Sequence, residues 1–369
     1  MTNEPTAAAS SQLDKWGWDT RVAALFQPHS GTLQLGRVLS EHRGGYLVAT
    51  EVGEVDAGVS GRYRHEARLA EDFPAVGDWV ALEMSDDGKS AVIQALIPRK
   101  TRFLRPARGD TGGAQVVAAN VDVVLLVTGL DHDFNLRRIE RHVALAWSSG
   151  AEPVIVLNKA DVCDDVGGRV ADATAIAPGV AIRVLSAIDG TGLDSLTPLL
   201  EPGKTVALIG SSGVGKSTIV NALLGWERQS TGAVREDDQR GRHTTTMREL
   251  VLTPSGALLI DSPGMRSVGM WDIDEGLAEA FADVEALASQ CRFSDCAHGT
   301  EPGCAVQAAI AAGTLPAARL QSQQKLEREW AAVARRVDPA ARAASAKRWK
   351  QIHKSVRNHM RIKYGSESG

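Results

Sequence analysis

The sequence predicts a multidomain α/β protein with a small N-terminal β-barrel, a central parallel sheet covered by helices on both faces, and a C-terminal helical region. Three observations predict this architecture. Short β-type runs without a helical stretch fill residues 31–98. Continuous apolar runs then alternate with amphipathic stretches up to about residue 271. The remaining chain is rich in Ala and contains a cluster of cysteines with a histidine.

Composition places the chain among globular proteins with more than one core. Its 369 residues exceed the usual span of a single hydrophobic core, and 43% are hydrophobic while 23% are charged. The formal net charge of −4 says little about partners, because the two signs are segregated along the chain. Neither a secretory signal nor a membrane-length apolar run is visible. We therefore expect a cytosolic, monomeric protein that makes no membrane contact.

The N-terminal part is predicted to contain a leader and a barrel. Residues 1–30 are rich in Ala, Ser and Thr and show no clear period, so we expect a flexible leader. Residues 31–105 follow as an OB-type barrel, although periodicity alone leaves an SH3-like barrel open. Its strands are expected at Thr32–Leu39, Tyr46–Val52, Gly58–His65, Asp78–Met84 and Ala91–Ile97.

Residues 106–271 are predicted to form the central α/β domain. Short, continuous apolar strands are typical of a parallel sheet that is buried on both faces. They are expected at Val121–Val127, Pro153–Leu157, Ala181–Leu185, Thr205–Ile209 and Ala257–Ile260, with an edge strand at Met247–Leu252 and the first helix at Phe134–Trp147.

A phosphate-binding loop is the clearest motif. Gly-Ser-Ser-Gly-Val-Gly-Lys-Ser follows the strand Thr205–Ile209 and opens the helix Thr218–Leu224, which is the context that this motif requires. Its backbone N–H groups would surround phosphate oxygens, Lys216 would reach the β- and γ-phosphates, and the Ser217 hydroxyl would bind Mg²⁺. The predicted nucleotide-binding residues here are Gly210, Ser211, Ser212, Gly213, Val214, Gly215, Lys216, Ser217 and Thr218.

Two further segments are expected at the phosphates. Asp-Ser-Pro-Gly follows an apolar strand, which places Asp261 at the Mg²⁺ shell and the Gly264 N–H near the γ-phosphate. The polar loop Gly241–Thr246 is of the kind that closes over Mg²⁺ when GTP is bound. Any of its adjacent threonines would serve as the Mg²⁺ ligand, and we favour Thr245.

Guanine specificity is predicted from Asn158-Lys159-Ala160-Asp161 at the end of the strand Pro153–Leu157. The Asp161 carboxylate can accept hydrogen bonds from guanine N1–H and its exocyclic amine, which adenine does not offer. Lys159 would cover the base, and Asn158 would tie loops together. Backbone N–H groups of Ser186 and Ala187 are expected at the guanine carbonyl. This segment precedes the phosphate loop, whereas it follows in ordinary small GTPases, so the domain is predicted to be circularly permuted.

Residues 272–369 are predicted to form a helical zinc domain with a basic tail. Cys291, Cys296, His298 and Cys304 offer three thiolates and an imidazole, a complete set for a closed, structural Zn²⁺ site. Reduced, buried cysteines remain the alternative on spacing alone. From Arg335 to Lys363 the chain carries many Lys and Arg residues and the single acid Asp338, which favours contact with RNA phosphates, with a solvated helix as the alternative.

In this order, the motifs resemble the small ribosomal subunit biogenesis GTPase family called RsgA or YjeQ, from about residue 31 to the end. The resemblance implies an OB-fold, a permuted GTPase core and a zinc domain. It also implies binding to the small (30S) ribosomal subunit and its rRNA late in maturation, with stimulated GTP hydrolysis. Met265 stands where many GTPases have the Gln that orients water, and the resemblance points to His243 instead. A phosphate-loop ATPase or kinase, and a nucleic-acid-binding zinc protein with a regulatory nucleotide site, are the competing interpretations.

Overall fold

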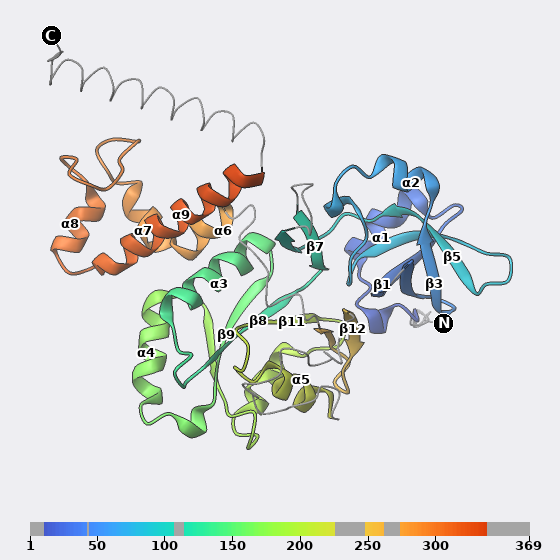
Figure 1. Ribbon diagram of the computed structural model, residues 1–369, viewed down its shortest axis with the longest axis horizontal. Helices are drawn as coiled ribbons and strands as arrows, with labels where there is room; N and C mark the ends of the chain where they lie inside the picture. Colours follow the sequence, from blue (N-terminus) through green and yellow to red (C-terminus); the bar gives the residue numbers. More distant parts are fainter. Residues whose placement is uncertain (1–10, 43, 107–113, 226–247, 262–273, 338–369) are drawn as a thin grey trace, which may run out of the picture.

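A computed structural model of the chain describes residues 11–42, 44–106, 114–225, 248–261 and 274–337. Figure 1 shows the barrel, the central sheet and the C-terminal helices as three regions that follow each other along the chain. The strands are β1 Gln34–His42, β2 Gly45–Thr50, β3 Gly53–Val59, β4 Trp79–Met84, β5 Ser90–Leu96, β6 Arg102–Pro106, β7 Ala114–Ala119, β8 Val123–Gly129, β9 Glu152–Asn158, β10 Ala181–Val184, β11 Thr205–Ile209, β12 Glu249–Leu252 and β13 Leu258–Asp261.

The helices of the described segments complete these regions. The α-helices are α1 Thr20–Phe26, α2 Gly61–Glu66, α3 Leu136–Ser149, α4 Val166–Ile176, α5 Lys216–Leu224, α6 Asp274–Ala280, α7 Ala282–Ala288, α8 Ala305–Ala311 and α9 Ala317–Val337. Short 3-10 helices lie at η1 Asp14–Trp16, η2 Gln27–His29, η3 Ala70–Asp72, η4 Ala160–Val162 and η5 Leu193–Leu199.

The N-terminal barrel has the OB-type form that was predicted. Its strands follow the order β1-β2-β3-β5-β4, and β1 also pairs with β4, which closes the barrel. One predicted strand is wrong: Gly58–His65 is the end of β3 followed by α2. The physical reason is the Ser60 hydroxyl, which accepts a hydrogen bond from the Tyr63 N–H at 3.0 Å and thereby caps a helix.

The expected flexible leader is wrong for residues 11–30, while residues 1–10 lie outside the described segments. Leu13, Trp16 and Val22 are buried and join the main hydrophobic core. The Asp19 carboxylate caps α1 by accepting from the Val22 N–H at 2.7 Å. The sequence does not indicate this ordered segment, because its few buried apolar residues lie in short helices and turns that give no regular hydrophobic period.

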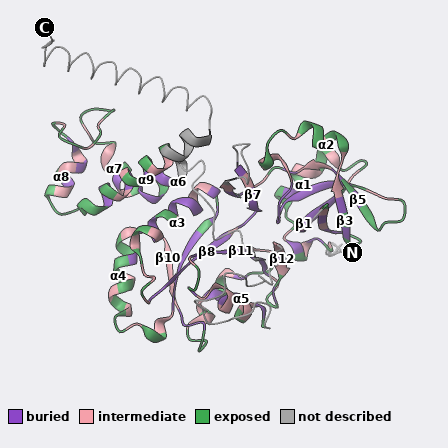
Figure 2. Cartoon of the chain, viewed as in Figure 1, coloured by how far each residue is buried: buried purple, intermediate pink, exposed green. Residues whose placement is uncertain are grey.

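The central sheet has the strand order β10-β9-β8-β11-β13-β12, with β11 near the middle. All neighbouring pairs are parallel except β12 with β13, so the predicted mostly parallel sheet is confirmed. Figure 2 shows the inner strands β8 and β11 buried along their length, whereas β10 is only half-buried. Side chains alternate between two cores: Val124 and Leu126 pack on the α3 side, while Val123 and Leu125 pack on the α5 side.

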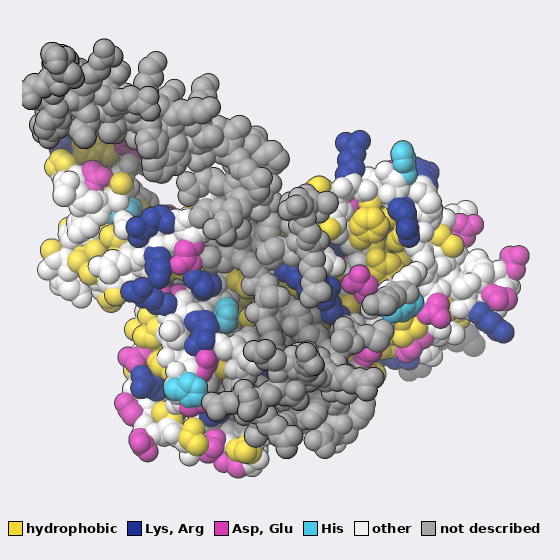
Figure 3. Space-filling view, viewed as in Figure 1, with side chains coloured by type: hydrophobic (Ala, Val, Ile, Leu, Met, Phe, Trp, Pro, Cys, Tyr) yellow, Lys and Arg dark blue, Asp and Glu magenta, His cyan; other side chains and the backbone are white. Residues whose placement is uncertain are grey.

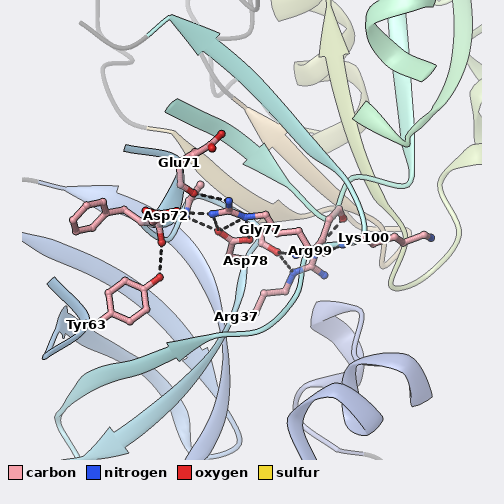
Figure 4. Close-up of polar contacts among 11 residues, drawn as sticks. Arg37, Tyr63, Glu71, Asp72, Gly77, Asp78, Arg99 and Lys100 are labelled. Atoms are coloured by element: carbon pink, nitrogen blue, oxygen red, sulfur yellow. Dashed lines mark hydrogen bonds and ion pairs between the residues drawn. The ribbon is translucent and has the colours of Figure 1, made fainter. Parts of the chain in front are cut away.

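Buried charges lie within the barrel and at its junction with this sheet, and Figure 4 shows the contacts around Arg37, Asp78 and Arg99. The Arg99 guanidinium pairs with the fully buried Asp78 carboxylate at 2.7 Å. Arg37, on β1, donates to the Thr205 hydroxyl at the start of β11 at 2.7 Å. Burial lowers the pKa of Arg37 to about 10, against the attraction of Asp122 and Asp78, so its side chain stays charged at neutral pH. The barrel is therefore fixed to the strand that leads toward the predicted phosphate loop.

The C-terminal helices pack on α3. Gly276 of α6 lies so close to the α3 backbone that a Cβ there would collide with the Ser148 nitrogen. Arg319 of α9 is the centre of this interface. Its guanidinium pairs with Glu140 of α3 at 3.1 Å and with Asp283 of α7 at 3.0 Å, and it lies 4.2 Å from the Phe281 ring centroid.

We predict that Arg319→Met destabilises the packing of the C-terminal helices by about 3–5 kcal/mol, because Glu140 would be left as an unpaired buried charge. Only 3% of the Arg319 side chain and 4% of the Glu140 side chain are exposed. The measurement is the thermal unfolding midpoint, with Arg328→Met as the control because Arg328 is an exposed arginine on the same helix. Equal midpoints for the two variants would contradict the prediction.

Candidate functional site

The predicted phosphate loop lies between β11 and α5, as the sequence indicated. Gly215, immediately before α5, adopts φ +95°, a backbone conformation that residues other than glycine rarely adopt. A Cβ at this position would also collide with the Asn158 amide. The Lys216 ammonium donates to the Gly210 carbonyl at 2.7 Å and also to the Ser211 carbonyl. These contacts hold the lysine over the mouth of the loop, next to the N-terminus of α5, where phosphate oxygens are favoured.

Asn158 connects the phosphate loop with two loops of the predicted guanine site. Its amide nitrogen donates to the Val214 carbonyl at 2.7 Å, and its amide oxygen accepts from the Ala187 N–H at 2.9 Å. The side chain is buried, with 3% of the residue exposed. Contacts across 56 and 29 residues of sequence thus bring the three segments to one end of the sheet.

Of the other two charged residues of the predicted guanine site, Lys159 is held by an ion pair and Asp161 is exposed to solvent. Lys159 adopts φ +66°, and its ammonium pairs with the Asp131 carboxylate at 2.7 Å. Burial works against ionisation of Asp131, but hydrogen bonds from Lys159 and Asp133 leave its pKa below the ordinary range. Asp161 lies in η4 and is exposed. The Ala160 N–H donates to the Leu185 carbonyl at 3.2 Å, which fixes the short helix to the neighbouring loop.

The backbone N–H groups of Ser186 and Ala187, which we expect at a guanine carbonyl, both have hydrogen-bond partners within the protein in this structure. The Ser186 N–H donates to the Thr191 carbonyl at 2.9 Å, and the Ala187 N–H donates to Asn158. Both donors are used to shape the loop. The Gly190 N–H donates to the Ser186 carbonyl at 2.9 Å, which closes a tight turn and brings the Thr191 carbonyl to the Ser186 N–H. The dipeptide alone gave no sign of this turn.

Several predicted residues lie outside the described residues. They are Gly264, His243 and Thr245, together with the neighbouring Thr244 and Thr246 and the basic tail after residue 337. Only the backbone of Asp261 is described: it ends β13, which runs parallel to β11, so it lies at the same edge of the sheet as the phosphate loop. The remaining predicted Mg²⁺ ligand, Ser217, lies in the first turn of α5.

Sequence analysis missed two charged contacts at this edge. Asp131 holds Lys159, and Arg138 of α3 donates to the Ser211 hydroxyl of the phosphate loop. Both partners are distant in sequence, by 28 and 73 residues. The only signal was the polar cluster around Asp131 and Asp133 directly after the strand β8, where ligand sites of parallel sheets occur.

The predicted metal ligands converge between α7 and α8. The ligand atoms of Cys291, Cys296, His298 and Cys304 all lie within 4.8 Å of one another. The distance between the Cys291 and Cys304 sulfurs is 3.9 Å, and His298 Nδ1 lies 3.5 Å from the Cys304 sulfur. Tetrahedral zinc ligands have sulfurs about 3.8 Å apart and sulfur-to-nitrogen distances of about 3.5 Å, so this set fits the ion. No other such cluster occurs among the described residues.

Comparisons with known proteins identify the family. The RsgA GTPase family matches residues 96–271. A relative from Opitutus terrae, called small ribosomal subunit biogenesis GTPase RsgA, is 48% identical over 95% of this chain and 98% of its own length. The chain belongs to the RsgA GTPase family. Membership confirms GTP hydrolysis, with Mg²⁺ accompanying GTP, over the predicted alternatives of an ATPase or a zinc protein with a regulatory nucleotide site.

Solved structures of RsgA-type proteins support the fold. YjeQ from Thermotoga maritima is 28% identical, with a TM-score of 0.61 over 80% of this chain and 98% of that one. YloQ, described as a circularly permuted GTPase, is 25% identical, with a TM-score of 0.59 over 82% and 96% of the two chains. The predicted permutation is therefore confirmed. In the described part of the chain, no helix is long and apolar enough to cross a membrane.

Proposed function

We propose that this GTPase assists the maturation of the small ribosomal subunit and that the subunit stimulates its GTP hydrolysis. The observation that carries the proposal is the match along 98% of the Opitutus terrae relative, whose name states this role. A match of that extent includes the barrel and the C-terminal helices, which a GTP-binding core alone does not require. The protein would work as a monomer in the cytosol, where ribosomal subunits are assembled.

The site residues have separable roles in this proposal. Asp161 reads guanine N1–H and the exocyclic amine, while Lys159, fixed by Asp131, covers the base. Lys216 neutralises the β- and γ-phosphates from its place beside the Gly210 carbonyl. The contacts of Asn158 support this assignment, because they hold the base-recognition segment against the phosphate loop.

Hydrolysis requires further groups that act on Mg²⁺, the γ-phosphate and the attacking water. Bound Mg²⁺ would neutralise developing charge on the phosphates, and Ser217, Thr245 and Asp261 would hold it. We assign His243 to orient the attacking water, with Gly264 contacting the γ-phosphate. The position of the Asp261 backbone at the end of β13 supports its part in this set.

Cys291, Cys296, His298 and Cys304 would hold one structural Zn²⁺. Their spacing supports this, and so does the position of Cys304 at the N-terminus of α8, where the Gln307 N–H donates to its sulfur at 3.4 Å. An amide donor and the start of a helix both stabilise a thiolate. With all four positions taken by protein ligands, the ion would organise the fold and leave catalysis to the nucleotide site.

RNA contact would come from basic surfaces on both sides of the GTPase core. In Figure 3, Lys and Arg side chains gather over α3 and α9, and a second group lies over α2 of the barrel. Exposed basic residues of these helices include Arg141 on α3, Lys325 on α9 and Arg64 on α2. Together with the basic tail, these would give salt-dependent contact with rRNA phosphates. The proposed functional units are residues 31–105, 106–271 and 272–369.

The test measures GTP turnover with and without isolated small ribosomal subunits. We predict that these subunits raise the turnover on the order of tenfold or more, because contacts from a partner order the catalytic groups of slow GTPases. Large subunits at the same concentration are the control for general RNA effects, and Lys216→Ala controls for contaminating GTPases. If small subunits neither co-sediment with the protein in a non-hydrolysable GTP analogue nor change its turnover, the proposed partner is wrong.

A further inference from the structure

The turn between β8 and α3 touches both halves of the nucleotide site. It is closed by the Asp133 N–H, which donates to the Asp131 carboxylate at 3.0 Å, and by the Phe134 N–H, which donates to the Asp131 carbonyl at 3.0 Å. The Asn135 side chain then caps α3 by accepting from the Arg138 N–H at 3.0 Å. One end of this turn holds Lys159 of the base-recognition segment. The other end holds Arg138 against the phosphate loop.

Arg138 is fixed in place by its neighbours. One terminal nitrogen lies 2.9 Å from the Asp133 carboxylate and also donates to the Ser211 hydroxyl, while the other donates to the Asp133 carbonyl. The side chain is about one third exposed, at 31%, and that of Asp133 is 18% exposed. This is an oriented guanidinium with a path to solvent at the edge of the loop. In an ordinary exposed ion pair, by contrast, the two long side chains are not confined to one geometry.

Buried atoms of this pair keep unused hydrogen-bonding capacity. Among the described residues, neither Arg138 Nε nor Asp133 Oδ2 has a hydrogen-bond partner, although both atoms are buried. Leaving such a group unmatched costs about 1–3 kcal/mol, so the arrangement needs an explanation beyond local stability. A guanidinium held in one orientation and partly exposed is suited to an anionic oxygen, to which it donates charge-assisted hydrogen bonds.

The surroundings are also electrostatically positive. His142 lies one helical turn after Arg138, and burial, followed by the charges of Arg138, Arg141 and Lys216, lowers its pKa to about 4. His142 is therefore neutral at physiological pH, while Arg138 and Lys216 act on the same buried ring. The charges of Arg138 and Lys216 thus meet near one carboxylate, that of Asp133, and such a surplus of positive charge favours the binding of a polyanion.

We propose that Arg138 is a positioning residue for the nucleotide phosphates. It braces the phosphate loop through the Ser211 hydroxyl, and its charge, oriented by Asp133, adds to that of Lys216. The inference rests on the proposed placement of GTP at this loop and names a group that the phosphate-loop motif does not contain. Because the turn that orients Arg138 also holds Lys159, base recognition and phosphate binding share one support.

The test is GTP affinity and steady-state kinetics of the full-length protein. Arg138→Ala is expected to weaken GTP binding and lower kcat/KM by about 10- to 100-fold, as expected for charge-assisted hydrogen bonds. It should also reduce the salt dependence of GTP binding, which a merely structural role would leave unchanged. Arg137→Ala is the matched control, because Arg137 is the neighbouring arginine on the same helix and is exposed.

Two further variants separate the roles. Arg138→Lys keeps the charge and loses the planar fork, so it should retain the salt dependence with partly restored affinity. Ser211→Ala should be strongly non-additive with Arg138→Ala, because both remove the same contact. If Arg138→Ala and Arg137→Ala bind GTP with the same affinity and salt dependence, the inference is wrong while the proposed site stands. If Lys216→Ala also leaves GTP binding unchanged, the site itself is misplaced.

Discussion

Replacing Cys291 and Cys296 with serine is expected to remove the zinc and unfold the segment between α7 and α9. Structural zinc contributes about 10–16 kcal/mol in small metal-dependent folds, which matches or exceeds the stability of a whole domain. The metal ligands span a stretch, Cys291 to Cys304, that contains no described helix or strand, and α8 begins directly after the ligand Cys304. Metal analysis should give about one zinc per parental chain and none for the double variant.

The nucleotide site should survive this change. Its loops are attached to strands whose α5-side core contains residues such as Val206, Leu208 and Ile219, none of which belongs to the C-terminal helices. We therefore expect GTP binding to persist while helix content and protease resistance fall. Cys163→Ser is the control, since Cys163 follows η4 in the central domain and is not one of the clustered metal ligands. Parental protein purified without chelator that contains no zinc would contradict the prediction.

Much of the central domain could be predicted because its signals are local. The strand Thr205–Ile209 was placed with the bounds that the structure has, since a continuous apolar run between a turn and a glycine-rich loop has few alternatives. The barrel is less predictable. The predicted strand Gly58–His65 runs past the end of β3 because Ser60 caps a helix, and a short polar stretch such as Gly61–Glu66 has no periodicity that separates a helix from a strand.

The unpredicted parts of the site are contacts between distant segments. Arg138 meets Ser211, and Arg319 meets Glu140, across 73 and 179 residues. No spacing rule connects such residues, because the fold creates their proximity only after the sheet and helices have packed. Motifs indicated the loops that we propose to bind the nucleotide, while the charges that hold those loops in place are seen only in the three-dimensional structure.

Asp161→Asn is expected to weaken GTP binding about 10²- to 10⁴-fold, because two hydrogen bonds to a charged acceptor, each worth about 1.5–3 kcal/mol, are lost. The substitution should improve binding of xanthosine triphosphate. Xanthine carries a carbonyl where guanine carries its exocyclic amine, and an asparagine amide can donate to that carbonyl. Competition of both nucleotides against a fluorescent GTP analogue measures the exchange of preference.

The surroundings of Asp161 allow its carboxylate to be replaced without disturbing the fold. Asp161 is exposed, so its replacement removes no packing, and η4 stays attached through the Ala160 N–H and the Leu185 carbonyl. Asp164→Asn is the matched control, since Asp164 is an exposed aspartate three positions along the same segment. Because Asp131 continues to hold Lys159 and Asn158 continues to hold Val214, any change in affinity reports on the carboxylate alone. Unchanged GTP affinity in Asp161→Asn would show that another group recognises the base.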